Sequence, residues 1–458
     1  MTISMSVKPR CPPTCRASAR AAGQSFPRRE RLLAMAQITA PRGTNDILPA
    51  ESPAWQILEG HARSIALRFG YAEIRTPMFE ATELFVRGVG ETTDIVEKEM
   101  YTFQDKGGRS MTLRPEWTAP VVRAVLQHNL MALGPQRLFY IGPFFRYERP
   151  QAGRYRQANQ FGVECFGYAG PEADVEVMQL AMALVARYNI VDARLQINTI
   201  GDEVCRPAYR DALLAHFRPH AAELSEDSQR RLERNPLRIL DSKSPADAPF
   251  IASAPTFLDT LCAACNEHFA AIRGYLDAIG LPYDVAPRLV RGFDYYTRTV
   301  FEITSQALGS QSAVCGGGRY DGLVSALGGP PTPAVGFGLG LERFLMVVKA
   351  MDPSVAPARS GFQAIALGVD ARFAMLPIVA ALRSLASVPT HFDFAERKIA
   401  AHFKTADRNN ARYALILGDD EIATGSIVLR DLVTREDRQI PTGPSPKETA
   451  QTLVEAIV

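Results

Sequence analysis

Two runs of alternating side chains, joined by a polar segment, constrain the fold of this chain most strongly. Residues 137–168 have the pattern of two strands, and residues 149–156 form the polar loop between them. Successive side chains of a strand point to opposite faces, so such a hairpin has one face to bury. The apolar face carries Phe145, Tyr147, Phe161, Val163 and Cys165. We therefore predict an antiparallel sheet with a core on this side.

The other face of the hairpin carries a polar set, namely Arg146, Glu148, Gln160, Gly162 and Glu164. A sheet face open to solvent would also be polar. Lysine and threonine are nearly absent here, however, and Gly162 at the centre has no side chain to cover the sheet. These two features favour a ligand-binding face over a merely solvated one.

A second candidate site is the segment Leu289–Arg298, in which Arg291 precedes the paired Tyr295 and Tyr296. An arginine guanidinium is always charged and binds phosphate oxygens through two parallel hydrogen bonds. The tyrosines could contact a polar ring of the same ligand. A strand with packed aromatic side chains explains the pattern equally well, so the residues alone leave both interpretations open.

Two glycine-rich stretches follow, Cys315–Asp321 and Gly336–Arg343. Glycine lets a backbone approach a nucleotide closely. Neither stretch has the lysine of a P-loop or the later acidic residue of a dinucleotide site. The second stretch leads into a predicted helix, with Arg343 in its first turn. Taken alone, such stretches are more typical of tight connections than of ligand sites.

The order of segments predicts about three folding units for the 458 residues. Ser52 and Pro53 predict the N-cap and the first turn of an early helix. Residues 203–283 have a largely helical pattern, and residues 352–360 have the composition of a linker. Residues 361–458 alternate short apolar strands with helical stretches, which predicts a compact α/β unit.

Residues 1–36 differ from the rest of the chain. They are rich in arginine and proline and contain a single acidic residue, Glu30. This composition fits either an organellar transit peptide or a segment upstream of a true start at Met35. The prolines interrupt any amphipathic helix, which favours the second interpretation. We expect a disordered extension and a cytoplasmic protein.

Charge and composition exclude several classes of protein. The formal net charge is +2, so binding of nucleic acid would need local basic patches. No run approaches the ~18 apolar residues of a membrane helix, so we expect no membrane partner. The seven scattered cysteines indicate free thiols in a reducing compartment.

Cys262 and Cys265, with His268 nearby, form the one cluster that resembles metal-ligand spacing. A zinc site needs a second pair of ligands at suitable spacing, and none is evident in the sequence. Leu261, Cys265 and Phe269 fall four residues apart, as buried side chains of a helix do. We therefore predict no metal site.

Together these motifs resemble those of class II aminoacyl-tRNA synthetases, and specifically the histidyl-tRNA synthetases. The motif 1 proline is Pro77, motif 2 is Phe145–Glu148, and motif 3 is Gly338–Arg343. The histidine-specific signatures are Leu289–Tyr296 and Gly317–Asp321, together with Leu113–Thr118 upstream. The resemblance covers nearly everything from Arg42 to Val458.

The resemblance implies an α+β fold, with an antiparallel sheet flanked by helices. The catalytic domain would span residues 37–351, with the helical segment 203–283 as an insertion. The α/β unit at 361–458 would be the anticodon-binding domain. The implied activity is ATP-dependent ligation of L-histidine to the 3′ end of tRNA(His) through a histidyl-adenylate.

The resemblance also implies which residues hold the amino acid: Glu116, Thr118, Arg146, Gln160, Glu164, Arg291, Tyr295 and Tyr296. Glu164 and Tyr296 would contact the two imidazole nitrogens, and a paired acceptor and donor suits such a ring. Amino acids without the ring would leave these groups unpaired, so no editing domain would be needed.

ATP would be held by Arg146, Glu148, Arg154 and Arg343, and Mg²⁺ would accompany its phosphates. Arg146 and Arg291 would be the catalytic residues, because both would contact the α-phosphate. Phosphoryl transfer of this kind needs positioning and charge stabilisation more than a general base.

Three positions depart from the family pattern. Trp117 stands where many relatives have glycine, beside Glu116. Ala158 stands where many have a phenylalanine that stacks on adenine. Residues 397–404 follow the pattern of the anticodon-binding domain only loosely, which leaves anticodon contacts open.

The alternative function is a non-catalytic paralogue, such as the synthetase-like regulatory subunit of ATP phosphoribosyltransferase. That class typically lacks the C-terminal domain and the active-site arginines, whereas this chain has both. A pure RNA-binding module fits the near-neutral charge poorly. The position of motif 1 implies a homodimer, and the insertion and the motif 2 loop would meet the acceptor stem, where an extra 5′ guanosine would be the main identity element.

Overall fold

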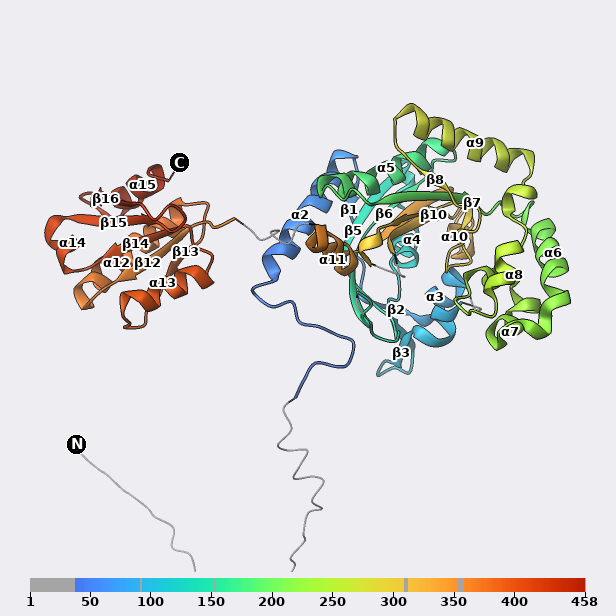
Figure 1. The fold of residues 1–458 in the computed structure, drawn as a ribbon, viewed down its shortest axis with the longest axis horizontal. Coiled ribbons are helices and arrows are strands. Elements are labelled where there is room, and N and C mark those ends of the chain that lie inside the picture. The colour runs from blue at the N-terminus through green and yellow to red at the C-terminus, as the bar shows by residue number, and fades with distance from the viewer. Residues whose placement is uncertain (1–37, 91–92, 152, 309–311, 352–357, 458) are drawn as a thin grey trace, which may run out of the picture.

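The computed structural model describes residues 38–90, 93–151, 153–308, 312–351 and 358–457 (Figure 1). The prediction for residues 1–36 and most of the predicted linker at 352–360 lie outside the described residues.

The catalytic part of the chain is built on a central eight-stranded sheet in the order β1-β5-β6-β11-β10-β9-β7-β8. The strands are antiparallel except for the outer pairs β1–β5 and β7–β8, which confirms the predicted sheet. The strands are β1 (Ala72–Glu73), β5 (Gln136–Phe145), β6 (Gln157–Phe166), β7 (Arg194–Thr199), β8 (Asp284–Val285), β9 (Thr297–Thr304), β10 (Ala313–Arg319) and β11 (Ala334–Gly340).

Four helices pack with one face of this sheet in the main hydrophobic core. They are α2 (Ser52–Arg68), α5 (Pro171–Arg187), α9 (Ala263–Ala278) and α11 (Leu341–Met351). Phe161, Val163 and Cys165 of β6 are fully buried there, as the alternation predicted. Tyr147 is 54% exposed, so its predicted burial is wrong. The reason is that β5 ends at Phe145, and the alternation does not continue beyond the strand end.

The opposite side of the sheet is only partly covered. Helices α4 (Thr118–Gln127) and α10 (Leu323–Ala326) pack against Leu138, Tyr140 and Phe166. Helix α3 (Thr82–Val89), the π-helical turn η1 (Ile95–Glu99) and a small sheet lie beside them. The small sheet has the order β2-β4-β3, with β2 (Phe79–Ala81), β3 (Tyr101–Gln104) and β4 (Ser110–Leu113). This arrangement leaves the polar residues of β6 facing a cavity.

Residues 206–259 of this chain form a compact helical unit around a separate hydrophobic cluster, and we call this part of the chain the helical subunit. Its elements are α6 (Arg206–Phe217), η3 (Arg218–Glu223), α7 (Glu226–Arg234), η4 (Pro236–Asp241), α8 (Ala248–Ser253) and η5 (Phe257–Asp259). The following helix, α9, packs against α5 in the main core instead. The boundaries of the predicted insertion, residues 203–283, stay a prediction. The segment that packs separately from the main core is shorter and spans residues 206–259.

The C-terminal unit has its own five-stranded sheet, in the order β13-β12-β14-β15-β16, and its own core. Its strands are β12 (Phe362–Ala366), β13 (Thr390–Phe392), β14 (Tyr413–Leu417), β15 (Ser426–Asp431) and β16 (Asp437–Pro441). Its helices are α12 (Val369–Leu385), α13 (Ile399–Arg408), α14 (Asp419–Thr424) and α15 (Pro446–Glu455).

Two local features bear on the sequence interpretation. The N-cap of α2 is Glu51, so the predicted cap at Ser52 is wrong by one residue; the Ser52 hydroxyl donates to the Leu48 carbonyl instead, at 3.2 Å.

No single helix among the described residues is long and apolar enough to cross a membrane. The segments Ala248–Asp259 and Ala263–Ala278 pass that test only as a pair, bent by 96°.

Candidate active site

The open face of the sheet holds a cavity of about 180 Å³, which we call the amino-acid pocket. Its floor is formed by β6, β10 and β11, and its walls by the start of α4 and the loop before β9. The eight residues predicted to bind histidine all line it: Glu116, Thr118, Arg146, Gln160, Glu164, Arg291, Tyr295 and Tyr296. The segment Leu289–Tyr296 is therefore a loop beside a cavity, not a packed strand.

Glu164 lies at the bottom of the amino-acid pocket and is 1% exposed. Its Oε1 accepts hydrogen bonds from the hydroxyls of Thr118 at 2.8 Å and Tyr140 at 3.2 Å, and its Oε2 accepts one from the Tyr320 hydroxyl. Burial raises the pKa of Glu164 to about 8, although these hydrogen bonds offset part of the effect. The carboxyl group is thus held in one orientation by three neighbours.

Glu116 occupies the turn before α4. Its carboxylate accepts the backbone N–H of Thr118 at 2.6 Å and of Ala119 at 2.9 Å, so it caps the helix. Burial raises the pKa of Glu116, and these two backbone hydrogen bonds oppose the rise. Each carboxylate oxygen has a further lone pair, so the cap can also accept from a ligand.

Glycines of β10 and β11 make room for the side chains of the amino-acid pocket. A Cβ on Gly338 would lie 1.4 Å from Nε2 of Gln160, and one on Gly316 would lie 2.1 Å from a nitrogen of Arg291. A Cβ on Gly336 would lie 2.1 Å from Oε2 of Glu164. The interpretation of these stretches as tight connections is therefore wrong: both form central strands whose missing side chains create the floor.

A second cavity of about 260 Å³, which we call the nucleotide pocket, adjoins the first. The four residues predicted to bind ATP line it: Arg146, Glu148, Arg154 and Arg343. Arg154 forms an ion pair with Glu148 at 3.3 Å. Burial lowers the pKa of Arg343, and the nearby Arg154 lowers it further, so a polyanion would be favoured here.

The two pockets share a wall formed by Phe144, Arg146 and Arg291. The Nε of Arg146 donates to the Pro115 carbonyl at 2.8 Å, and its Nη1 lies 3.7 Å from Oε1 of Glu148. Arg291 is held by Glu302 at 2.7 Å. A group that bridged the pockets would therefore meet two guanidinium groups.

Trp117 and Ala158, the two departures from the family pattern in the catalytic part of the chain, both fit into the structure. Trp117 stacks on Tyr140, with centroids 4.5 Å apart, and the guanidinium of Arg114 lies 3.3 Å from its ring centroid. A Cβ on Gly142 would lie 2.9 Å from the Trp117 ring, so glycine there makes room for it. Ala158 lines the nucleotide pocket and supplies no ring.

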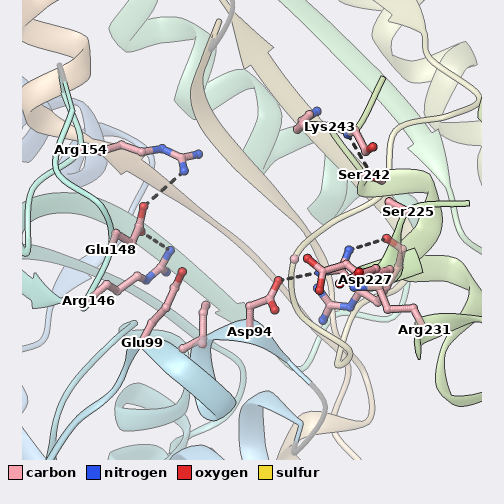
Figure 2. Close-up of a pocket in the computed structure, with 15 residues that line it drawn as sticks. Asp94, Glu99, Arg146, Glu148, Arg154, Ser225, Asp227, Arg231, Ser242 and Lys243 are labelled. Carbon is pink, nitrogen blue, oxygen red and sulfur yellow. Dashed lines mark hydrogen bonds and ion pairs between the residues drawn. The ribbon is translucent and has the colours of Figure 1, made fainter. Parts of the chain in front are cut away.

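A third and larger cavity, of about 670 Å³, lies between the motif 2 loop and the helical subunit. Figure 2 shows Arg146, Glu148 and Arg154 on one side of it and Ser225, Asp227 and Arg231 on the other. The buried Asp247 accepts hydrogen bonds from Ser225, Ser228 and Ser242, which fixes the loops of the subunit at the cavity edge.

Sequence reasoning missed Tyr140, Tyr320 and Glu302 as site residues. Tyr140 pairs with Gly162 across the β5–β6 ladder, and a Cβ there would lie 2.3 Å from the tyrosine hydroxyl. A tyrosine opposite a glycine was the available signal. Tyr320 belongs to the signature Gly317–Asp321, but its contact with Glu164 exists only in the folded chain, as does the contact of Glu302 with Arg291.

A family model described as histidyl-tRNA synthetase matches residues 43–344, about two thirds of the chain. The chain belongs to the histidyl-tRNA synthetase family. A model of the anticodon-binding domain matches residues 378–448, within the C-terminal unit.

Curated relatives from several bacteria agree with this assignment. The histidine–tRNA ligase of Pelotomaculum thermopropionicum is 49% identical over 88% of this chain and 95% of its own length. That of Moorella thermoacetica is also 49% identical, over 88% of this chain and 95% of its own length.

Solved structures of the family share the fold. The apo histidyl-tRNA synthetase of S. aureus is 35% identical and superposes with a TM-score of 0.75, covering 92% of this chain and 99% of that one. A Bacillus halodurans structure, titled as an ATP phosphoribosyltransferase regulatory subunit or histidyl-tRNA synthetase, is 21% identical with a TM-score of 0.60 over 84% of this chain and 100% of that one. At that identity the likeness concerns the fold alone.

Proposed function

We propose that this chain activates L-histidine with ATP and transfers the histidyl group to the 3′ end of tRNA(His). The observation that carries the proposal is the shared wall of the two pockets. A carboxylate in the amino-acid pocket and an α-phosphate in the nucleotide pocket would meet at Arg146 and Arg291. Those are the two groups that must react to form an aminoacyl-adenylate.

In the amino-acid pocket, Glu164 and Tyr296 would contact the imidazole nitrogens, with Tyr295 beside the ring. Glu116, Thr118 and Gln160 would hold the α-amino group. The buried position of Glu164 supports this assignment, because Thr118, Tyr140 and Tyr320 hold its carboxyl group in one orientation as a fixed acceptor for a ring N–H.

In the nucleotide pocket, Glu148 would accept a hydrogen bond from the adenine amino group, and Arg154 and Arg343 would bind the outer phosphates. A carboxylate oxygen of histidine would attack the α-phosphorus, and the bond to the β-phosphate would break to release pyrophosphate. Arg146 and Arg291 would neutralise the charge that develops on the α-phosphate oxygens.

Mg²⁺ would bind with ATP and neutralise phosphate charge. Mg²⁺ in such sites keeps water ligands and takes one or two carboxylates besides the phosphates. Glu302 and Glu342 both line the nucleotide pocket and fit this need. Both carboxylates already have a partner, since Glu342 accepts the backbone N–H of Asn159 at 2.8 Å and Glu302 pairs with Arg291 at 2.7 Å, so an ion would share either one with its partner.

The third cavity adjoins the nucleotide pocket and would receive the 3′ end of the tRNA. Arg231, Arg238 and Lys243 from the helical subunit line this cavity; Arg231 is paired with Asp94 at 3.1 Å and Arg238 with Asp294 at 2.9 Å, and they would exchange these partners for phosphates of the tRNA backbone. A ribose hydroxyl of the terminal adenosine would attack the histidyl carbonyl, and AMP would leave. The C-terminal unit would contact the anticodon.

We also propose a homodimer. Met78 and Phe79, next to the motif 1 residue Pro77, are 52% and 53% exposed, and Phe103 beside them is 44% exposed. An apolar group of this kind supports a protein interface at this edge. Sedimentation velocity should give a dimer, and a monodisperse monomer would contradict this part.

Aminoacylation tests the proposed function as a whole. The chain should attach labelled histidine to a tRNA(His) transcript but not to the same transcript after periodate oxidation of its 3′ diol. Failure to charge the intact transcript, from a folded protein that binds histidine, would favour the regulatory alternative.

A further inference from the structure

Three cysteines and an aspartate converge at the base of the helical subunit, away from the three cavities. The thiols of Cys205, Cys262 and Cys265 and a carboxylate oxygen of Asp202 all lie within 4.8 Å of one another. Cys205 and Asp202 precede α6, whereas Cys262 and Cys265 are at the start of α9. We propose that these four side chains form a structural Zn²⁺ site that joins the two ends of the helical subunit.

The distances fit tetrahedral coordination. Zn–S bonds of about 2.3 Å give S···S edges of about 3.8 Å in a tetrahedron. Side chains already within 4.8 Å need only small rotations to reach that geometry. Three thiolates select a soft or borderline ion over Mg²⁺ or Ca²⁺, which prefer oxygen ligands.

The surrounding hydrogen bonds resemble an outer coordination sphere. The backbone N–H of Cys262 donates to Sγ of Cys205 at 3.1 Å. Arg298 forms an ion pair with Oδ2 of Asp202 at 3.2 Å, while Oδ1 accepts the backbone N–H of Val204 at 3.1 Å and lies 4.0 Å from Sγ of Cys262. Such partners orient ligands and offset their negative charge.

The position of the thiols distinguishes a site from a chance cluster. Cys205 and Cys262 are the N-caps of α6 and α9, so both thiols lie at helix N-termini. Gly201, at φ +59°, lies so close that a Cβ there would be 2.5 Å from the Cβ of Cys205. Cys205 and Cys265 are buried, whereas Cys262 is half-buried and gives an ion a path of entry.

The sequence predicted no metal site because no second pair of ligands was found near Cys262 and Cys265. The second ligand pair exists, but it lies 57 to 60 residues before Cys262, far outside the spacing of a compact zinc motif. His268, the expected neighbour, lies instead 3.7 Å from Asp174.

A metal at this site would stabilise residues that contact the active-site cavities. It would close the long loop between Cys205 and Cys262, which lowers the conformational entropy of the unfolded subunit. Arg206, the next residue after Cys205, donates to the carbonyl of Tyr296 in the amino-acid pocket. The same subunit supplies Arg231 and Arg238 to the third cavity. The metal would therefore hold the subunit in place over the site.

Metal analysis of the full chain, purified without a metal-affinity tag, tests the proposal. We expect about one zinc per chain, removable only by strong chelators. Cobalt substitution should give intense thiolate-to-cobalt charge-transfer bands and the visible bands of tetrahedral cobalt. Zinc below about 0.1 per chain, with no such bands on cobalt titration, would overturn it.

Variants identify the ligands. Cys262→Ala and Asp202→Asn should weaken zinc binding at least ~10-fold, whereas Cys165→Ala, a buried thiol of β6, should keep it. Equal zinc loss in all three variants would contradict the assignment.

Thiol labelling of the wild-type chain covers the case in which a ligand variant does not fold. Zinc should slow the modification of Cys262, and a chelator should speed it at least ~10-fold. A Cys205–Cys262 disulfide in the freshly purified protein, with no metal, would overturn the proposal.

Discussion

The amino-acid pocket and the nucleotide pocket lie side by side but are built differently. The amino-acid pocket is a buried network in which Glu164 is already bound by Thr118, Tyr140 and Tyr320. The nucleotide pocket is an array of arginines whose partners, such as Glu148, are carboxylates that remain partly exposed to solvent. Recognition of an uncharged ring needs fixed donors and acceptors, whereas phosphate binding needs charges that can exchange partners.

The largest expected effect is at the shared wall. Arg291→Ala should slow formation of the histidyl-adenylate in a single turnover by about 10³-fold, because one guanidinium no longer stabilises the α-phosphate. Arg288→Ala in the same loop, which contacts the Ala252 carbonyl, is the matched control and should keep the rate. Comparable losses in both variants would indicate damage to the loop rather than a catalytic role.

The floor of the amino-acid pocket should be nearly as sensitive. Gly338→Ala would place a methyl group against the Gln160 amide and should lower kcat/KM for histidine by about 10²-fold, with a smaller change in KM for ATP. Gly322→Ala, where a Cβ meets no atom within 4 Å, should behave like the wild type. Gly338 lines both pockets, so equal effects on histidine and on ATP would mean that the methyl group disturbs their common floor and not the Gln160 amide alone.

The pH dependence of folding stability should report on Glu164, the buried carboxyl group of the amino-acid pocket. The pKa of Glu164 is about 8 in the fold and lower in the unfolded chain, so the native state binds more protons between those values. Its contribution to stability is full at acidic pH and is lost as the pH rises towards 8. The melting temperature of Glu164→Gln should therefore rise relative to the wild type between pH 5 and pH 8. A constant difference would show that Glu164 does not titrate in this range.

The smallest effect is expected at Ala158. Ala158→Phe would add a ring to the wall of the nucleotide pocket and should lower KM for ATP about 3-fold, within the range of one aromatic contact. The KM for histidine should not change. An increase in KM for ATP would mean that the adenine already fills this space.

The sequence predicted some parts of this arrangement better than others. Strand alternation identified the polar residues of β6, because period-2 patterning reports directly which face a side chain occupies. It failed at Tyr147, where the strand had ended, and it could not detect Tyr320, whose contact with Glu164 joins positions 156 residues apart. The cysteine cluster was missed for the same reason, since its two halves meet only in the folded chain.

The central claim is that the two pockets suffice to join histidine to AMP at their common wall. Exchange of labelled pyrophosphate into ATP, measured without tRNA, tests it most directly. We expect exchange that requires histidine and is not supported by other amino acids. No exchange from a folded chain that binds both histidine and ATP would contradict it.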